Sequence, residues 1–462
     1  MLSSALLTQL RSLVGAEHVR TDDDSRQMYG ADALNRGVPA DAVVLPGSTA
    51  DVAAVMRLCA EHRIPIVPRG LGSGYTGGAV PLHGGIVLAL DRMNHIIEID
   101  EQNLIAVVEP NVVTGDLQDA VERLGLFYPP DPASLRQSSI GGNVAECAGG
   151  PRAFKYGTTK QYVLGLEAVL PTGEIVETGG KVVKNVVGYD LTHLLVGSEG
   201  TLAIITKVIV RLIPKPPLQA TLRACFANVE AAVAAVSNIV RARVVPASLE
   251  LVDRESLEAV AEYLHSRSLA PDGTGAILLV DVDGVPSAVD EEASRVEGAC
   301  REAGATEVLR ARDEQERSEL WRVRRELSYS LKTVASLKFN HDVVVPKARI
   351  PELFALVDRM RSEFRLRIPL FGHAGDGNIH VNIMVDAADT EAIARARQAE
   401  RVLFEGVVEL EGAITGEHGI GFSKAPYLPI ELSADEIALM KRIKQAFDPL
   451  GILNPGKIFP SG

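Results

Sequence analysis

The chain has 462 residues, of which 46% are hydrophobic and 23% charged, as expected for a globular protein with a large core and more than one domain. Its formal net charge of −13, with no basic block, argues against a nucleic-acid-binding surface. The four cysteines lie far apart and form no C-x-x-C pair, which argues against a cysteine-built iron–sulfur cluster or zinc site and fits a reducing cytoplasm.

The first forty residues are expected to form an N-terminal helical segment. Apolar residues recur at helical spacing between Leu2 and Val14, without the basic start or continuous apolar run of a signal peptide. The acidic run 22–24 argues against a transit peptide, and no apolar stretch reaches the roughly 18 residues of a transmembrane span. We therefore expect a cytoplasmic protein, with peripheral attachment at the inner membrane as the alternative.

A nucleotide-binding loop is predicted in the N-terminal half. Residues 42–45 and 64–67 read as strands and residues 52–62 as the helix between them, which makes a β-α-β unit. The sequence PRGLGSGYTGG follows at 68–78, and its backbone N–H groups could hold a pyrophosphate because glycines permit close approach. A Rossmann loop would continue directly into a helix, whereas here a strand is predicted at 86–90. This context argues against NAD and leaves a plain glycine-rich turn as the alternative.

A second loop combines rigid and permissive residues. PPDPAS at 129–134 is followed by SSIGGNVA at 138–145. Proline fixes φ while glycine relaxes it, so we expect a rigid bend that leads into a turn. Its ordinary interpretation is a long loop, and such loops often carry function in enzymes.

Two histidines and a glutamate form a candidate metal site. His373 and His380 flank a glycine-rich turn in GHAGDGNIH, and the alternation that follows predicts a strand with His380, Asn382 and Met384 on one face. TGEHGIG at 415–421 then places Glu417 beside a third histidine. Two histidines and one carboxylate would make a divalent-metal site with an open position. Because a single His-x6-His spacing is weak evidence, ordinary structural histidines are the alternative.

Taken together, these motifs resemble a known flavoprotein group. The P-R-G-x-G-S-G loop, the P-D-P-x-S…I-G-G-N-x-A segment and GSEGTL at 197–202 resemble the superfamily of vanillyl-alcohol oxidase and p-cresol methylhydroxylase. The G-H-x-G-D-G-N-x-H and G-E-H-G-I-G stretches, with NPGK at 454–457, are similar to its branch of D-lactate dehydrogenase, D-2-hydroxyglutarate dehydrogenase and the glycolate oxidase flavin subunit. The resemblance runs from about Asp41 to Phe459 with the motifs in order.

The resemblance implies an α+β fold. A two-part FAD-binding domain of the p-cresol methylhydroxylase type would cover residues 41–216, and a substrate (cap) domain with an antiparallel sheet would cover 217–422. Residues 423–462 would return to the FAD domain. The sequence agrees, because a proline-rich break at 214–217 follows a predicted strand at 202–212, and helical and strand-like patterns then alternate.

The resemblance also implies FAD as cofactor. It assigns FAD binding to Pro68, Arg69, Gly70, Gly72, Ser73, Gly74, Thr76, Gly77, Pro130, Asp131, Ser134, Ser138, Ile140, Gly141, Asn143, Ala145, Gly200, Ile204 and Asn454. Relatives with covalently bound flavin often carry a histidine in the glycine loop. Ser73 stands there in this chain, so we expect non-covalent FAD. Asn111 replaces a glycine that is common in relatives, which is expected to affect only a turn.

The chemistry implied by the resemblance is oxidation of a D-2-hydroxy acid (D-lactate, D-2-hydroxyglutarate or glycolate) to the 2-oxo acid. His373, His380 and Glu417 would hold a divalent metal that polarises the substrate hydroxyl. Zinc is the first expectation, and manganese or iron also suits these ligands. His418 would be the general base, because an imidazole titrates near neutrality, and hydride would pass to the flavin.

Four further residues are implied for the substrate. Arg324 would bind the carboxylate with its planar fork, and Ser328 lies four residues on, on the same face of a predicted helix. Lys338 and Asn382 match the lysine and asparagine of the relatives. The alternative is a shift in register that exchanges the role of Arg324 with Arg322 or Arg325.

Two other functions compete. A zinc hydrolase could use the same ligands with His418 as acid or base, but it leaves the glycine loop unexplained. A non-catalytic FAD electron-transfer subunit is the third interpretation, and the complete set of ligands and His418 argue against it. Because the chain has no iron–sulfur motif, the electrons would pass to an acceptor protein, a partner iron–sulfur subunit or a quinone; the chain could also form a homodimer.

Overall fold

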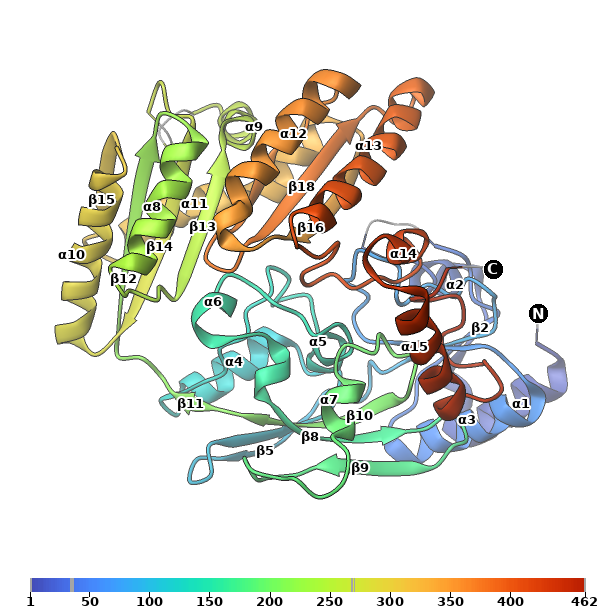
Figure 1. The fold of residues 1–462 in the computed structure, drawn as a ribbon. Coiled ribbons are helices and arrows are strands. Elements are labelled where there is room, and N and C mark those ends of the chain that lie inside the picture. Colours follow the sequence, from blue (N-terminus) through green and yellow to red (C-terminus); the bar gives the residue numbers. More distant parts are fainter. Residues whose placement is uncertain (1, 34–36, 267–268, 270, 461–462) are drawn as a thin grey trace. The chain divides into compact units, whose positions relative to one another are not determined.

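The computed structural model describes residues 2–33, 37–266, 269 and 271–460. Met1 and residues 34–36, which belong to the predicted N-terminal segment, lie outside this description. The chain divides into two compact units (Figure 1). The first comprises Met1–Gly149, Gly157–Lys215 and Glu417–Gly462, and the second comprises Gly150–Tyr156 and Pro216–Gly416.

The first unit contains a small sheet in the order β1-β2-β4-β3. Its strands are β1 (Val19–Arg20), β2 (Ala42–Val44), β3 (Ile66–Arg69) and β4 (Ile86–Ala89). The predicted β-α-β unit is confirmed, with β4 inserted between its two strands and parallel to both. The apolar stripes of α1 (Ser4–Val14) and α3 (Thr49–His62) pack on this sheet. Residues 70–85, all of which are described, contain no helix, as the argument against a Rossmann loop predicted.

The first unit also contains a five-stranded antiparallel sheet in the order β5-β6-β10-β8-β9. Its strands are β5 (Ile96–Asp100), β6 (Ile105–Val108), β8 (Val163–Val169), β9 (Ile175–Gly179) and β10 (Ile204–Arg211). The remaining elements of this unit include α2 (Asp23–Tyr29), α4 (Thr114–Glu122), α5 (Ile140–Glu146), α7 (Leu191–Leu195), α14 (Leu428–Glu431), α15 (Ala434–Phe447) and the short pair β7 (Leu126–Phe127) and β11 (Ile213–Pro214). The C-terminal segment returns to β3, where the backbone of Ile66 bonds to Ile452 and Asn454.

The second unit is built on a seven-stranded antiparallel sheet in the order β15-β12-β14-β13-β17-β18-β16. Its strands are β12 (Leu218–Phe226), β13 (Ser248–Asp253), β14 (Ala276–Gly284), β15 (Glu307–Arg310), β16 (Leu337–Val344), β17 (Leu370–His373) and β18 (Asn378–Val385). The predicted antiparallel sheet with helices is therefore confirmed.

Helices cover both faces of this sheet. Helices α9 (Arg254–Leu264) and α11 (Glu314–Val334) share one apolar core with one face. The opposite face is covered by α8 (Val229–Arg241), α10 (Pro286–Glu302), α12 (Ile350–Phe364) and α13 (Thr390–Glu409), as Figure 1 shows. Every residue of β18 is therefore buried, including its polar ones, and a buried polar side chain needs a partner.

Candidate active site

The two histidines of the candidate metal site lie on a tight hairpin. His373 ends β17, His380 lies on β18, and His373 pairs with Asn378. The turn requires Gly377, whose φ is +87° and whose Cβ, if added, would lie 1.9 Å from the Val345 carbonyl oxygen. The imidazole rings of His373 and His380 meet edge to face with centroids 5.4 Å apart.

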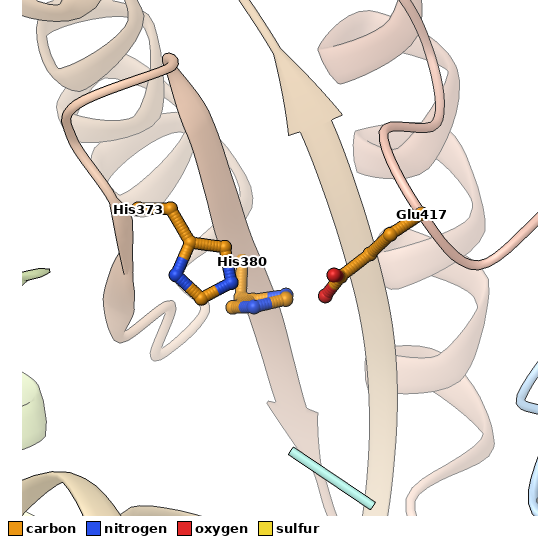
Figure 2. Close-up of side chains that lie close together, drawn as sticks. All are labelled: His373, His380 and Glu417. Carbon is orange, nitrogen blue, oxygen red and sulfur yellow. The ribbon is translucent and has the colours of Figure 1, made fainter. Parts of the chain in front are cut away.

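Glu417 completes the group. The segment that precedes it is fixed on β16, because the Asp342 carboxylate accepts hydrogen bonds from Thr415 Oγ1 (3.1 Å) and Gly416 N (3.0 Å). One ligand atom from each of His373, His380 and Glu417 lies within 4.8 Å of the other two. Figure 2 shows the Glu417 carboxylate pointing toward the imidazole of His380. The donor set fits a divalent transition metal with room for a further ligand.

A buried carboxylate orients the first histidine. Glu250 on β13 is fully buried, and its Oε1 lies 2.5 Å from His373 Nδ1. Burial opposes its ionisation, but the interactions with His373 and Arg324 outweigh burial and lower the pKa of Glu250 to about 2. An ionised carboxylate can only accept, so Nδ1 of His373 carries the proton and Nε2 is the nitrogen that can bind a metal. Sequence reasoning missed Glu250; the available signal was a charged residue inside the aliphatic run LELV.

The same carboxylate holds Arg324. The Arg324 Nε donates to Glu250 Oε2 at 2.7 Å, and its guanidinium carbon lies 4.7 Å from the centre of the Phe371 ring. The Arg324 side chain is 12% exposed, whereas that of Arg322 is 42% exposed and pairs with Glu319. Arg325 bonds to the Ser318 carbonyl. Of these three arginines, α11 turns Arg324 toward the sheet.

Ser328, one turn beyond Arg324, is exposed on α11. The buried serine of this helix is Ser330, whose hydroxyl bonds to the carbonyls of Glu326 and Leu327. The structure therefore brings Arg324, but not Ser328, to the buried face of the helix.

Lys338 and Asn382 lie on the same face of the sheet as His380. In the β16–β18 register, Lys338 pairs with Met384, Asn340 with Asn382, and Asp342 with His380. Burial, with a smaller effect of Lys332, lowers the pKa of Lys338 to about 8.

Two asparagines on this face, Asn382 and Asn340, have side-chain oxygens that accept no hydrogen bond from the described residues. Asn382 Nδ2 makes long bonds to the carbonyls of Pro369 (3.4 Å) and His380 (3.3 Å). The buried Oδ1 atoms of Asn382 and Asn340 have no hydrogen-bond partner among the described residues. Two buried acceptors side by side indicate a place for donors from a ligand or water. Asn340 was not predicted as a site residue.

His418 lies on a segment of the first unit that packs against the glycine loop. Thr76 Oγ1 donates to the His418 carbonyl at 3.0 Å, and the Tyr75 ring meets the imidazole edge to face with centroids 5.1 Å apart. His418 Nε2 lies 3.8 Å from Glu417 Oε1. Its side chain is 13% exposed, so the imidazole is mostly buried but still accessible to solvent.

Glu199 fixes the next residues of this segment. Its buried carboxylate accepts from Ile420 N (2.8 Å) and Gly421 N (2.7 Å), and burial raises its pKa while these bonds oppose the rise. Asn454 Nδ2 donates to the carbonyls of Gly78 (2.9 Å) and Glu199 (2.8 Å). The glycine loop and the motifs around 199, 420 and 454 are thus tied together. The GSEGTL motif was noted in the sequence, but no role was predicted for Glu199.

All residues that the resemblance assigned to FAD lie in the first unit. Pro68 and Arg69 belong to β3, and the glycine loop after it carries Gly70, Gly72, Ser73, Gly74, Thr76 and Gly77. The loop before α5 carries Pro130, Asp131, Ser134 and Ser138, and α5 itself carries Ile140, Gly141, Asn143 and Ala145. Gly200 lies in the turn that precedes β10, Ile204 begins β10, and Asn454 lies in the C-terminal segment. These segments converge, because an added Cβ on Gly70 would meet Ser139 Oγ at 2.4 Å and one on Gly200 would meet Pro68 at 2.8 Å. Such close backbone approach fits a cradle for a pyrophosphate.

Several of these side chains form hydrogen bonds with other residues of the first unit. Arg69 Nη1 donates to the Ala31 carbonyl at 2.7 Å, and burial lowers the Arg69 pKa. Asn143 Nδ2 donates to Thr114 Oγ1 at 2.6 Å. Together with Thr76 and Asn454, these side chains hold the loops in place.

Comparison with known proteins identifies the family of this chain. Residues 215–458 match the model of the C-terminal domain of FAD linked oxidases, and residues 40–179 match a FAD binding domain. The glycolate oxidase subunit GlcD of Bacillus subtilis is 42% identical over 99% of this chain and 97% of its own length. A D-lactate dehydrogenase of Anaerostipes hadrus is 38% identical over 89% of this chain and 88% of its own. The structure of p-cresol methylhydroxylase with substrate bound superposes with a TM-score of 0.80 over 98% of this chain and 96% of that one, at 20% identity.

The chain therefore belongs to the FAD-linked oxidases, and its fold is that of p-cresol methylhydroxylase. The predicted fold class, the FAD cofactor and the enzyme class, an FAD-linked oxidoreductase, are confirmed. None of the described helices combines the length and apolar character needed to cross a membrane.

Proposed function

We propose that this protein is an FAD-dependent dehydrogenase that oxidises a D-2-hydroxy acid (D-lactate, D-2-hydroxyglutarate or glycolate) to the corresponding 2-oxo acid. One observation carries the proposal: the Glu250 carboxylate contacts both His373 and Arg324. His373 is a candidate metal ligand, and Arg324 is the candidate cation for a substrate carboxylate. A 2-hydroxy acid offers a hydroxyl to a metal and a carboxylate to an arginine from adjacent carbons. The names of the relatives, glycolate oxidase subunit and D-lactate dehydrogenase, support this substrate class.

FAD bound to the first unit would accept the hydride. Ser73 in the glycine loop offers no nucleophilic imidazole, so we propose that FAD is held without a covalent bond. Acid precipitation should release the yellow colour into the supernatant, and colour that stays with a thoroughly washed pellet would contradict this assignment.

A divalent metal, zinc first and manganese or iron as alternatives, would be held by His373, His380 and Glu417, where it would polarise the substrate hydroxyl. The Nε2 of His373 is the donor in this scheme, since Nδ1 is engaged by Glu250. Treatment of the holoenzyme with a chelator should abolish turnover and a divalent metal should restore it, with FAD retained throughout.

Arg324 and Lys338 would bind the substrate carboxylate. Because the Arg324 Nε is committed to Glu250, its two terminal nitrogens are the ones that can meet the substrate, and these match the two carboxylate oxygens. The Oδ1 atoms of Asn382 and Asn340 would accept hydrogen bonds from bound ligand or water. Ser328 remains a candidate hydroxyl partner despite its exposure.

His418 would accept the hydroxyl proton while hydride leaves the α-carbon. The loop bonds to Thr76 and Glu199 would hold the imidazole in position for this step. Electrons would then leave to an acceptor protein, a quinone or a partner iron–sulfur subunit, and the name of the relative as a subunit supports a multi-chain assembly over a simple homodimer.

One experiment tests the whole proposal. The purified holoenzyme is mixed anaerobically with a panel of D- and L-2-hydroxy acids, and flavin absorbance is followed. Bleaching by a D-acid or glycolate, but not by the L-acids, supports the assignment. A non-catalytic FAD subunit would leave the flavin oxidised with every acid.

A further inference from the structure

One buried carboxylate in the second unit contacts two proposed site residues, although it meets neither metal nor substrate itself in the proposed chemistry. Glu250 lies on β13, in register with His373 on the neighbouring strand β17, and it is fully buried. Its Oε1 lies 2.5 Å from His373 Nδ1 and its Oε2 lies 2.7 Å from Arg324 Nε. One carboxylate oxygen therefore contacts the proposed metal ligand His373, and the other contacts Arg324, which is proposed to bind the substrate carboxylate.

Simple packing does not account for this arrangement. Burying a carboxylate is costly, and a buried ion pair often contributes less stability than apolar residues of the same volume. In some proteins a buried polar network fixes the orientation of the groups that it contacts. Here Glu250 and the face of the Phe371 ring together hold the plane of the Arg324 guanidinium.

Resting on the function proposed above, we propose that Glu250 is a positioning residue that couples the metal site to the substrate carboxylate site. A rotation of this one carboxylate moves both His373 Nε2 and the terminal nitrogens of Arg324. Metal affinity and carboxylate affinity should therefore weaken together when Glu250 is altered, and by linkage each site should sense a change at the other.

Glu250→Gln is the sharpest variant, because the amide has the same shape but only one acceptor oxygen. If that oxygen accepts from Arg324 Nε, the amide nitrogen faces His373 Nδ1 and favours the imidazole form with its proton on Nε2, which blocks the metal. If the oxygen accepts from His373 Nδ1, the amide nitrogen faces Arg324 Nε, and both of these nitrogens are hydrogen-bond donors. Either orientation disturbs one of the two sites, and exchange between them disturbs both.

Glu400→Gln is a matched control. Glu400 is also buried in the second unit between a histidine and an arginine, with His341 Nε2 at 3.2 Å and Arg397 Nη1 at 3.1 Å. His341 alternates with Asn340 and Asp342 along β16, so this pair lies on the opposite face of the sheet. The control removes the same kind of interaction without touching the candidate site.

The test measures two quantities on FAD-loaded protein. The first is the dissociation constant of Zn²⁺ or Mn²⁺, obtained by titrating chelator-treated holoprotein against a chromophoric competitor. The second is the KM for the acid that bleaches the wild-type flavin best. Glu250→Gln should weaken metal binding by about ten- to a hundredfold and raise KM by about tenfold or more, while Glu400→Gln changes neither.

A reciprocal measurement covers the case in which Glu250→Gln does not fold. Arg324→Ala leaves the candidate ligands intact, yet it should weaken metal binding several-fold because Glu250 loses its second partner. The exposed control Arg322→Ala should not. Unchanged metal affinity in Glu250→Gln, or in Arg324→Ala if the first variant is unfolded, overturns the coupling. If no 2-hydroxy acid bleaches the wild-type flavin but metal affinity still falls in these variants, the coupling stands and the proposed substrate class fails.

Discussion

Asp342 pairs in register with His380 across β16 and β18, and its carboxylate binds the two residues that precede Glu417. The strand that neighbours one candidate ligand thus anchors the segment that carries another. Because His380 and Glu417 are several tens of residues apart in the sequence, their proximity depends on this anchor.

We expect Asp342→Asn to weaken metal binding by about tenfold while FAD remains bound, because the amide loses the negative charge and one of the two oxygens that accept from Thr415 Oγ1. Competition with a chromophoric chelator measures the affinity. Asp281→Asn is the control, since Asp281 is a buried aspartate of the same unit that bonds to Thr221 and Trp321. Equal metal affinity in the two variants would show that Asp342 does not position Glu417.

His418→Asn should slow flavin reduction by about a hundredfold or more, in line with the loss of a general base. Metal content should survive, since Glu417 rather than His418 is the proposed ligand. Stopped-flow reduction and metal analysis check the two expectations separately. His193→Asn, in the first unit and paired with Asp190, is the control and should leave the rate unchanged. Loss of metal together with activity would mean that the roles of Glu417 and His418 are misassigned.

Arg324→Ala should lower kcat/KM by about thirty- to a thousandfold, which corresponds to about 2–4 kcal/mol for a charge-assisted pair in a partly desolvated pocket. Arg324→Lys should recover only part, because an ammonium group cannot make the two parallel bonds. Arg322→Ala should have little effect, as its side chain is exposed and pairs with Glu319. A damaging Arg322→Ala beside a nearly neutral Arg324→Ala would move the carboxylate site to the other face of α11.

The pH dependence of substrate capture should report Lys338. Its pKa is lowered to about 8 by burial and by Lys332, so the cation is present below that pH and is lost as the pH rises through it. We expect kcat/KM to fall on the alkaline side with an apparent pKa near 8. Lys338→Arg should remove this decline, since a guanidinium stays charged.

Lys332 provides a second check on the same residue. Its charge lowers the pKa of Lys338, so Lys332→Gln should move the alkaline decline to higher pH without removing it. A pH profile that is identical in wild type, Lys338→Arg and Lys332→Gln would assign the decline to another group.

Local patterns predicted much of the fold. The alternation after His380, the helix over 52–62 and the strand at 202–212 are all present, because each depends on burial within one segment. The convergence of His373, His380 and Glu417 was also expected, but from the resemblance and the donor types rather than from periodicity.

What the sequence did not reveal depends on register between distant strands. Glu250 meets His373 because β13 pairs with β17, and Asp342 lies beside His380 because β16 pairs with β18. No spacing in the sequence encodes these pairings. The partner of Arg324 was likewise hidden, since a helix pattern identifies the buried face but not the carboxylate opposite it.

The return of the C-terminal segment to β3 means that β3 is synthesised long before the residues that pair with it. Ile66 uses its backbone N–H and carbonyl to bond Ile452 and Asn454, and Leu453 adds to the apolar core beneath the small sheet. The ribosome synthesises β3 several hundred residues before these partners. The edge of the small sheet therefore stays unpaired while the entire second unit is synthesised. Such an exposed edge can pair with other chains, and a nascent chain of this protein therefore needs shielding until its last segment emerges.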